Sequence, residues 1–209
     1  MTLLLAFDTA TPQVSVALHD GEQVLVELVS DRAMKHGEQL APLIAAALEQ
    51  AGAVRQDLTA VAVGAGPGPF TGLRVGLVTA RTLGFALDIP VYAACSLDVI
   101  AVEAAATVAS GPFTVATDAR RKEVYLASYS AEGHRLSGPV VIRPEEAATD
   151  EPTAGEGALL YPDAFPNAFG PTRPSAGWLA HAVSEELLEL MDPEPLYLRR
   201  PDAVASAQR

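Results

Sequence analysis

The chain has 209 residues, 49% of them hydrophobic and 19% charged, and a net charge of −12 with a sequence pI of about 4.6. This length predicts one large domain or two small lobes with a packed core. An acidic surface repels phosphate backbones, so the chain alone is a poor candidate for binding nucleic acid, and any RNA substrate would have to be held by a partner.

Sequence features that would direct the chain out of the cytoplasm are missing. No apolar run approaches the roughly 18 residues of a membrane-spanning helix, and residues Met1–Asp8 lack the basic region of a signal peptide. Cys95 is the single cysteine, which excludes an intramolecular disulfide. We therefore expect a cytoplasmic protein without membrane association.

The first 30 residues predict an antiparallel three-stranded meander. Leu3–Phe7 is a short apolar run that ends at Asp8, and residues 14–18 alternate between apolar and small or polar side chains. Asp20-Gly21 is a hairpin signal, after which Val24–Val29 forms the third strand.

Helices and strands then alternate up to residue 110. Apolar residues at helical spacing predict a helix over Leu40–Ala51, with Pro42 tolerated only near its start and an apolar arc wide enough to be covered on two sides. The following elements are a strand, a helix, a strand and a helix that Ser96 caps: Ala60–Ala65, Thr71–Leu87, Pro90–Ala94 and residues 96–109. The order βββαβαβα ends at Gly111-Pro112, which separates an N-terminal lobe, 1–110, from a smaller C-terminal lobe, 111–209.

The second lobe begins as the first does. Phe113–Thr117 is an apolar strand that ends at Asp118, and Val124–Tyr129 is a second strand. Asp8 precedes Val14 by the same six residues that separate Asp118 from Val124, which fits either a degenerate internal repeat or the chance recurrence of a common motif.

Beyond Ile142 the pattern weakens. We expect a short helix within loops over residues 144–157, irregular chain over 161–174 and a helix over Ala176–Leu190. The tail from Pro195 to Pro201 should be extended and return to the N-terminal lobe, with the last eight residues mobile.

The segment Gly66–Arg74 reads Gly-Pro-Gly-Pro-Phe-Thr-Gly-Leu-Arg and leads from a strand into a helix. Glycines permit close approach and helix N-termini can hold anions, so Gly66, Gly68 and Thr71 are candidate phosphate-binding residues. The glycine spacing matches neither a dinucleotide fingerprint nor a P-loop, and an ordinary rigid loop is the alternative.

Small residues recur at every fourth position of the next helix, at Gly72, Gly76, Ala80 and Gly84. Because glycine costs about 1 kcal/mol in a helix, we expect this ridge to accept a close neighbour. We place the ridge in a helical seam formed with the preceding helix and a second chain. Further candidate interface residues are His36, Leu40, Leu43, Ile44, Ala47, Leu73 and Arg81.

Two turns that begin at a strand-ending aspartate resemble the phosphate-binding turns of actin-like ATPases. Asp8 and Thr9 are candidate nucleotide-binding residues, although a simple Asx turn explains them equally well. The second turn, Asp118–Lys122, keeps the carboxylate but has no glycine and carries bulky basic side chains that could contact a phosphate or an acidic partner. Independent ATP hydrolysis is therefore not expected.

Metal and nucleophile constellations are also missing. The four histidines are scattered, and Cys95 and Trp178 are interpreted as core residues.

Six segments resemble the TsaB family: 5–11, 36–44, 66–76, 94–97, 118–121 and 195–199. Pro69 stands where that family usually has serine. The resemblance implies a two-lobed fold of the actin-like ATPase and sugar-kinase superfamily, and similarity to TsaD. TsaD transfers a threonylcarbamoyl group to the adenosine beside the anticodon of tRNAs that read codons beginning with A. The two metal-binding histidines of TsaD correspond to Leu97 and Ala101 here, so the resemblance implies loss of the metal.

The primary hypothesis is a non-catalytic dimerisation subunit that supports TsaD. The resemblance implies that it pairs with TsaD through the two N-lobe helices, works with TsaE and a threonylcarbamoyl-AMP synthase, forms a homodimer in isolation and reaches tRNA only indirectly. It implies no cofactor on the chain alone, with ATP or ADP accommodated only at an interface with TsaD. The rival hypothesis is an independent ATPase that uses Asp8 and the Gly66–Thr71 turn, and a peptidase is a third, weaker one.

Overall fold

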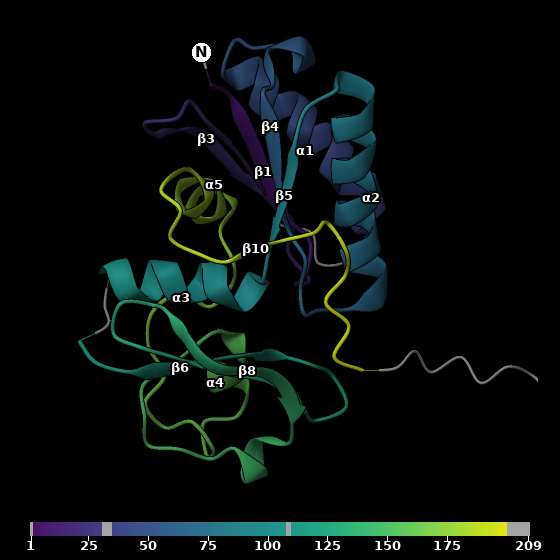
Figure 1. Cartoon of the computed structure of the whole chain (residues 1–209). Coiled ribbons are helices and arrows are strands. Elements are labelled where there is room, and N and C mark those ends of the chain that lie inside the picture. Colours follow the sequence, from purple (N-terminus) through teal and green to yellow (C-terminus); the bar gives the residue numbers. More distant parts are fainter. Residues whose placement is uncertain (1, 31–34, 108–109, 200–209) are drawn as a thin grey trace, which may run out of the picture.

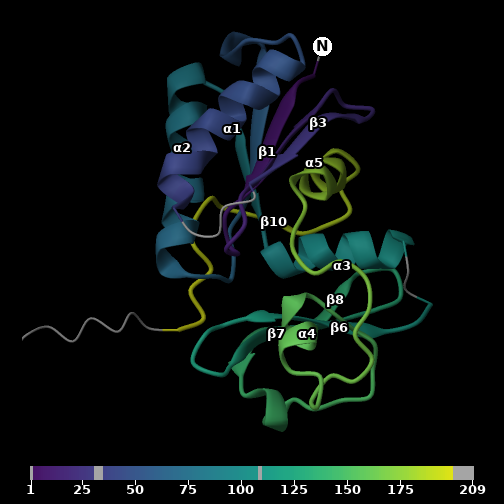
Figure 2. The same ribbon diagram turned by 180° about the vertical axis from the view of Figure 1, so that it is seen from behind.

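The computed structural model describes residues 2–30, 35–107 and 110–199. Two mixed sheets, each with flanking helices, form two lobes stacked one above the other (Figures 1 and 2). This confirms the predicted α/β class and the two-lobed, actin-like arrangement. The predicted mobility of the last eight residues lies outside the described ranges.

The first sheet has six strands in the order β10-β5-β4-β1-β2-β3. The predicted meander is correct, because β2 pairs antiparallel with β1 on one side and with β3 on the other. On its other side β1 pairs in parallel with β4, which in turn pairs in parallel with β5. The strands are β1 Leu4–Asp8, β2 Ser15–His19, β3 Val24–Val29, β4 Ala60–Gly64, β5 Val91–Ala94 and β10 Leu190–Met191.

Helices cover both faces of this sheet (Figure 1). Helices α1 (His36–Gln50) and α2 (Phe70–Leu87) pack on one face with Leu5 and Phe7, whereas α5 (Ala176–Ser184) packs on the opposite face with Leu4 and Ala6. The alternation follows from the two-residue period of a strand. A short 3₁₀ turn, η1 (Arg55–Asp57), precedes β4, and helix α3 (Ser96–Thr107) lies between the lobes (Figure 2).

The second sheet has four strands in the order β8-β7-β6-β9. Strand β6 lies between antiparallel β7 and parallel β9, just as β1 lies between antiparallel β2 and parallel β4. The two lobes therefore share their local pairing around the strand that ends in aspartate. The elements are β6 Phe113–Asp118, β7 Val124–Tyr129, β8 Arg135–Ile142, the 3₁₀ turn η2 Pro144–Glu146, β9 Thr153–Ala154 and α4 Glu156–Leu160. Residues 161–174 are irregular as predicted, apart from a single bridge between Thr153 and Ala168.

Two element boundaries differ from the sequence prediction. Helix α1 begins four residues earlier than expected, at His36, because its N-cap Lys35 is left-handed and offers no side-chain cap that could be read from the sequence. Pro42 thus lies inside the helix rather than in its first turn. The helix predicted over Ala176–Leu190 ends at Ser184, since Glu186 is left-handed (φ 55°) and Leu190 pairs with Ala94 in the sheet.

Strand β8 was missing from the predicted elements. It contains Gly138, at φ 86°, and Pro139, which interrupt the alternation that marks a strand. Both residues are tolerated because β8 is an edge strand, where an amide is not required on the outer side.

Candidate functional site

Asp8, at the end of β1, has both carboxylate oxygens engaged within the chain. Oδ2 accepts a hydrogen bond from Ser96 Oγ at 2.6 Å, and Oδ1 accepts one from the Ala10 amide at 2.7 Å. The residue is 1% exposed, and burial raises the pKa of its carboxyl although both hydrogen bonds act to lower it. Asp8 therefore ties β1 to the start of α3.

The glycine-rich segment Gly66–Gly72 approaches the same turn closely. A Cβ atom on Gly68 would overlap the carbonyl oxygen of Ala10, and one on Gly72 would overlap the carbonyl oxygen of Thr9. Thr9 is fully buried and donates a hydrogen bond from Oγ1 to the Gly72 carbonyl at 2.8 Å. The close approach predicted for this segment is thus present, but the partner is the chain's own Asp8–Thr11 turn.

The glycine ridge of α2 has a different partner from the one predicted. Gly72, Gly76, Ala80 and Gly84 are all buried inside the chain. A Cβ on Gly76 would overlap Thr9 Oγ1, and one on Gly84 would overlap the Val91 side chain. The ridge therefore lets the α2 backbone pack onto the Asp8–Thr11 turn, His36 of α1 and strand β5 within the chain. A bulky side chain at Gly76 would disrupt the fold instead of probing an interface.

The turn at the end of β6 is built in another way. The Asp118 carboxylate accepts a hydrogen bond from the Arg120 amide at 2.8 Å. It also forms an ion pair with the Arg120 guanidinium at 3.1 Å. Arg120, Arg121 and Lys122 all have left-handed backbones, with φ of 61°, 56° and 62°, and all three are exposed. Non-glycine residues adopt this conformation at a cost of about 1 kcal/mol or more each, so the turn is strained as well as basic.

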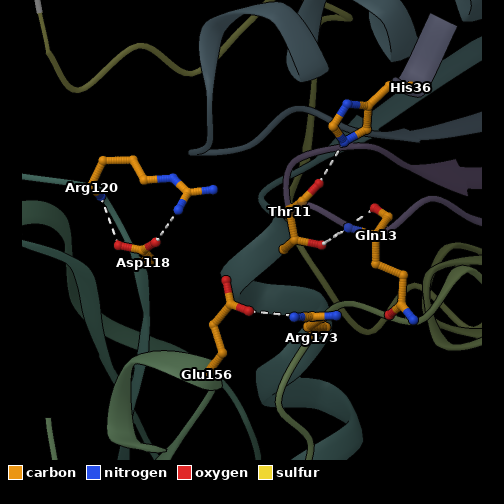
Figure 3. A network of polar contacts seen from close by, with 7 residues as sticks. All are labelled: Thr11, Gln13, His36, Asp118, Arg120, Glu156 and Arg173. Carbon is orange, nitrogen blue, oxygen red and sulfur yellow. Dashed lines mark hydrogen bonds and ion pairs between the residues drawn. The ribbon is translucent and has the colours of Figure 1, made fainter. Parts of the chain in front are cut away.

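A cleft of about 460 Å³ separates the two turns. His36 forms part of its wall and is held in place by a hydrogen bond from Nε2 to the Thr11 carbonyl at 2.7 Å. Arg120 reaches it from the second lobe (Figure 3). The cleft is lined by Pro12, Lys35, His36, Gly37, Glu38, Pro69, Thr71, Gly72, Val75 and Arg120.

Figure 3 also shows two further polar contacts. Glu156, at the start of α4, pairs with Arg173 at 2.9 Å, and Thr11 Oγ1 accepts a weak hydrogen bond from the Gln13 amide at 3.4 Å. His36, predicted as an interface residue, is 8% exposed and is instead a buried support for the Asp8–Thr11 turn.

The outer surface of α1 and α2 has an apolar face that the chain itself leaves uncovered. Phe85 is 92% exposed and Val78 is 61% exposed. We define the helical face as the exposed residues Ala41, Pro42 and Ala45 of α1 with Val78, Arg81 and Phe85 of α2. The predicted apolar arc of α1 is therefore covered by the chain on one side only.

Most of the predicted interface residues point inward. Arg81 is exposed and Leu43 is half-buried, whereas the others pack in the core under the helices: Leu40, Ile44, Ala47 and Leu73. The sequence analysis missed Val78 and Phe85, although two apolar residues seven positions apart on the side of α2 away from the glycines are a readable signal.

The C-terminal segment spans both lobes next to the cleft. The Leu196 amide donates to the Ala65 carbonyl at 2.9 Å, and the Tyr197 ring stacks on Phe70 with centroids 4.9 Å apart. Arg74 lies over the Phe70 ring and donates to Tyr197 Oη at 3.1 Å. Arg199 pairs with Glu123 of the second lobe. The predicted return of the segment thus fixes the entry to α2 against the second lobe.

The remaining candidate positions are buried in the core. Among the described residues no three His, Cys, Asp or Glu side chains are grouped as metal ligands, and Leu97 and Ala101 are buried in the core. Burial raises the pKa of the Cys95 thiol to about 12, which disfavours the reactive thiolate. Within the described ranges, no helix is both long enough and apolar enough to cross a membrane.

Comparisons with known proteins point to one pathway. A family model described as TsaD, tRNA N6-adenosine threonylcarbamoyltransferase, matches residues 28–170. A tRNA threonylcarbamoyladenosine biosynthesis protein TsaB from Haemophilus influenzae is 33% identical over 88% of this chain and 75% of its own length. The TsaB protein of Escherichia coli is 31% identical over 77% of this chain and 74% of its own.

Other relatives match over nearly the full length. An uncharacterized protein of Mycobacterium tuberculosis is 43% identical over 97% of this chain and 94% of its own. A solved structure from Pseudomonas aeruginosa, described as an uncharacterized protein with similarity to peptidase YEAZ, superimposes with a TM-score of 0.80. It is 30% identical and covers 95% of this chain and 100% of its own.

Proposed function

The chain belongs to the TsaB family of tRNA threonylcarbamoyladenosine biosynthesis proteins, and from that premise we propose that it is a non-catalytic subunit that binds and activates TsaD. TsaD would then transfer the threonylcarbamoyl group to the adenosine adjacent to the anticodon of tRNAs that read A-starting codons. The observation that carries this proposal is the uncovered helical face of the first lobe. In the same lobe the Asp8–Thr11 turn, the candidate nucleotide-binding turn, is packed against α2.

The filled turn supports the non-catalytic part of the proposal. In a nucleotide-hydrolysing relative of this fold, the turn after the first strand has to be open to phosphate and metal. Here Asp8 is bonded to Ser96 and Ala10, and Thr9 lies beneath Gly72. These contacts argue against the rival hypothesis of an ATPase that uses Asp8 and Thr9.

The helical face supports the partnership. An apolar side chain as exposed as Phe85 raises the free energy of the lone chain in water, and burial against a partner would recover about 25 cal/mol per Å². We propose that TsaD covers this face in the active complex and that a second copy of this chain covers it when TsaD is absent.

The other assignments follow from the same premise. We propose a cytoplasmic complex in which TsaE and a threonylcarbamoyl-AMP synthase act with TsaD, and in which tRNA is held by the partners because this chain is acidic. Any ATP or ADP would lie at the interface with TsaD, which the exposed Arg120 and the open cleft could border.

Introducing a negative charge on the helical face tests the proposal. We expect Val78→Glu and Phe85→Glu to retain the fold, because both side chains are exposed, but to abolish co-elution with the cognate TsaD on size exclusion. The threonylcarbamoyladenosine content of tRNA from cells that carry only these variants, measured by mass spectrometry, should fall to background.

Leu159→Glu is the matched control, since Leu159 on α4 is 62% exposed, close to the 61% of Val78. It should leave both complex and modification intact. Retained complex in the Val78 and Phe85 variants would contradict the assigned interface. Saturable ATP binding with turnover by the isolated chain, lost on Asp8→Asn, would instead support the independent ATPase.

A further inference from the structure

A second open surface lies on the side of the first lobe away from the helical face. Strand β3 is the last strand of its sheet and, among the described residues, pairs only with β2. Its apolar side chains Val24, Leu25 and Val29 are 39%, 42% and 43% exposed. An apolar edge strand with an unpaired backbone side is a template for adding another strand. Figure 1 shows β3 at the margin of the lobe with α5 next to it.

A cavity of about 250 Å³ opens where this edge meets α5. Its wall combines two carboxylates with Trp178, which is half-buried, and two histidines. The lining residues are His19, Glu22, Gln23, Val24, Glu27, Gly177, Trp178 and His181.

The charge of this cavity is negative. Its lining contains Glu22 and Glu27 but no lysine or arginine. Burial lowers the pKa of His19, which keeps its imidazole neutral near pH 7, and Asp20 and Glu185 lie close enough to oppose that shift. An indole beside carboxylates that have no cationic partner in the described structure is the surrounding that a guanidinium or ammonium group prefers.

The carboxylate of Glu27 is held in place by the fold. Its Oε1 accepts hydrogen bonds from Ser15 Oγ at 3.1 Å, Ser175 Oγ at 2.7 Å and the Gly177 amide at 3.2 Å. No hydrogen bond to Oε2 is present among the described residues, so this oxygen is left for a donor from outside. Glu22 sits in the hairpin turn and its carboxylate has no ion pair within the described ranges.

His19 is a second unsatisfied group at the cavity. The residue is 1% exposed, and its Nδ1 accepts a hydrogen bond from the Gly21 amide at 3.0 Å. Nε2 must then carry the proton, and this donor has no partner in the described structure. A buried donor without a partner costs about 1–3 kcal/mol, and since arginine and lysine side chains bring only donors, a main-chain carbonyl of a bound segment is the group that would accept from it.

We propose that the β3 edge and this cavity bind an extended basic segment of a partner protein, which adds a strand beside β3 and inserts an arginine or lysine side chain between Trp178, Glu22 and Glu27. The main chain supplies hydrogen bonds along β3, and the inserted cation supplies specificity. The apolar residues Val24, Leu25 and Val29 favour such a segment over a free amine, because a small cation would leave them uncovered.

Intrinsic fluorescence tests the proposal directly, since Trp178 is the only tryptophan of the chain. The probe is an equimolar pool of seven-residue peptides with arginine at the centre and Val, Ile, Thr or Lys at the flanking positions. A matched pool carries glutamine at the centre. We expect a saturable change in Trp178 emission with the arginine pool and at least tenfold weaker binding of the glutamine pool.

Variants of the full chain assign the response to this cavity. Glu22→Gln should weaken binding at least tenfold without altering the circular dichroism melting curve, whereas Glu151→Gln, an exposed carboxylate of the second lobe, should have no effect. Hydrogen exchange of the β3 amides should slow when the arginine pool binds. The proposal is overturned by the absence of a saturable change, by equal binding of the two pools, or by N-ethylguanidinium alone binding as tightly as the peptides.

Discussion

The two lobes end their first strand in the same way and then diverge. Asp8 and Asp118 are each the last residue of a strand that lies between an antiparallel and a parallel neighbour. After Asp8 the chain is buried under the glycines of α2. After Asp118 three exposed residues, Arg120–Lys122, take left-handed backbones and carry positive charge.

This difference shows how one turn position can serve two purposes. In the first lobe the absence of side chains at Gly68 and Gly72 lets their backbone pack against the carbonyls of Ala10 and Thr9, and Gly76 leaves room for the Thr9 hydroxyl, so the turn stabilises the fold. In the second lobe the residues keep their side chains and accept backbone strain, so the turn presents exposed cations, of which Arg120 lies at the edge of the cleft. The following predictions break or sharpen that contrast.

The largest effect is expected from Gly72→Ala. A Cβ there would overlap the backbone carbonyl of buried Thr9, which cannot rotate away. We expect the free energy of unfolding to fall by about 2–4 kcal/mol, more than the roughly 1 kcal/mol that alanine contributes to helix propensity. Urea unfolding followed by circular dichroism measures it.

Gly37→Ala is the matched control, because Gly37 also lies in the first turn of its helix and its Cβ would meet nothing closer than Val75 at 3.9 Å. This variant should be stabilised, by up to about 1 kcal/mol. Equal stability of the two variants would mean that the first-lobe turn is not packed as described.

The burial of Asp8 is expected to have a smaller effect, on how the free energy of unfolding depends on pH. Because burial raises the pKa of this carboxyl above 3.8, the folded chain holds its proton to higher pH than the unfolded chain does. The folded state then binds more protons in the interval between the two pKa values, so this group reduces stability as pH rises through that interval.

Asp8→Asn removes this dependence. We expect the free energy of unfolding of the parent chain to decline, relative to Asp8→Asn, as pH rises upward from about 4. Denaturant titrations at several pH values measure the difference, with Asp118→Asn as the corresponding change in the second lobe. Parallel curves for the parent and Asp8→Asn would contradict a raised pKa for Asp8.

Much of this contrast could be predicted from the sequence. The strands around Asp8 and Asp118 follow from short apolar runs, and the close approach of Gly66–Gly72 follows from its glycines. The sequence could not reveal which surface the ridge of small residues on α2 meets, since a groove of small residues accepts a turn as readily as a helix. The residues of this ridge are Gly72, Gly76, Ala80 and Gly84.

Other features had no local signal. Arginine and lysine rarely adopt left-handed backbones, so nothing in the sequence marks Arg120–Lys122 as strained. The carboxylate of Asp8 is fixed by Ser96, 88 residues away, and Phe70 is stacked on Tyr197 at the far end of the chain. Such long-range contacts depend on topology, which short-range patterns do not encode.

The smallest effect is expected at the second turn, from Lys122→Gly. Lys122 has φ 62°, a conformation that glycine adopts without the Cβ penalty, but glycine also makes the unfolded chain more flexible. These opposing terms leave a net stabilisation of up to about 1 kcal/mol, opposite in sign to Gly72→Ala. The same urea unfolding measures it, and a loss of stability would show that the Lys122 side chain makes contacts that outweigh the strain. If Lys122 contacts TsaD as part of the proposed function, the complex that TsaD forms with this variant should modify less tRNA although the variant itself is more stable, which would separate the role of the turn in the fold from its role in the complex.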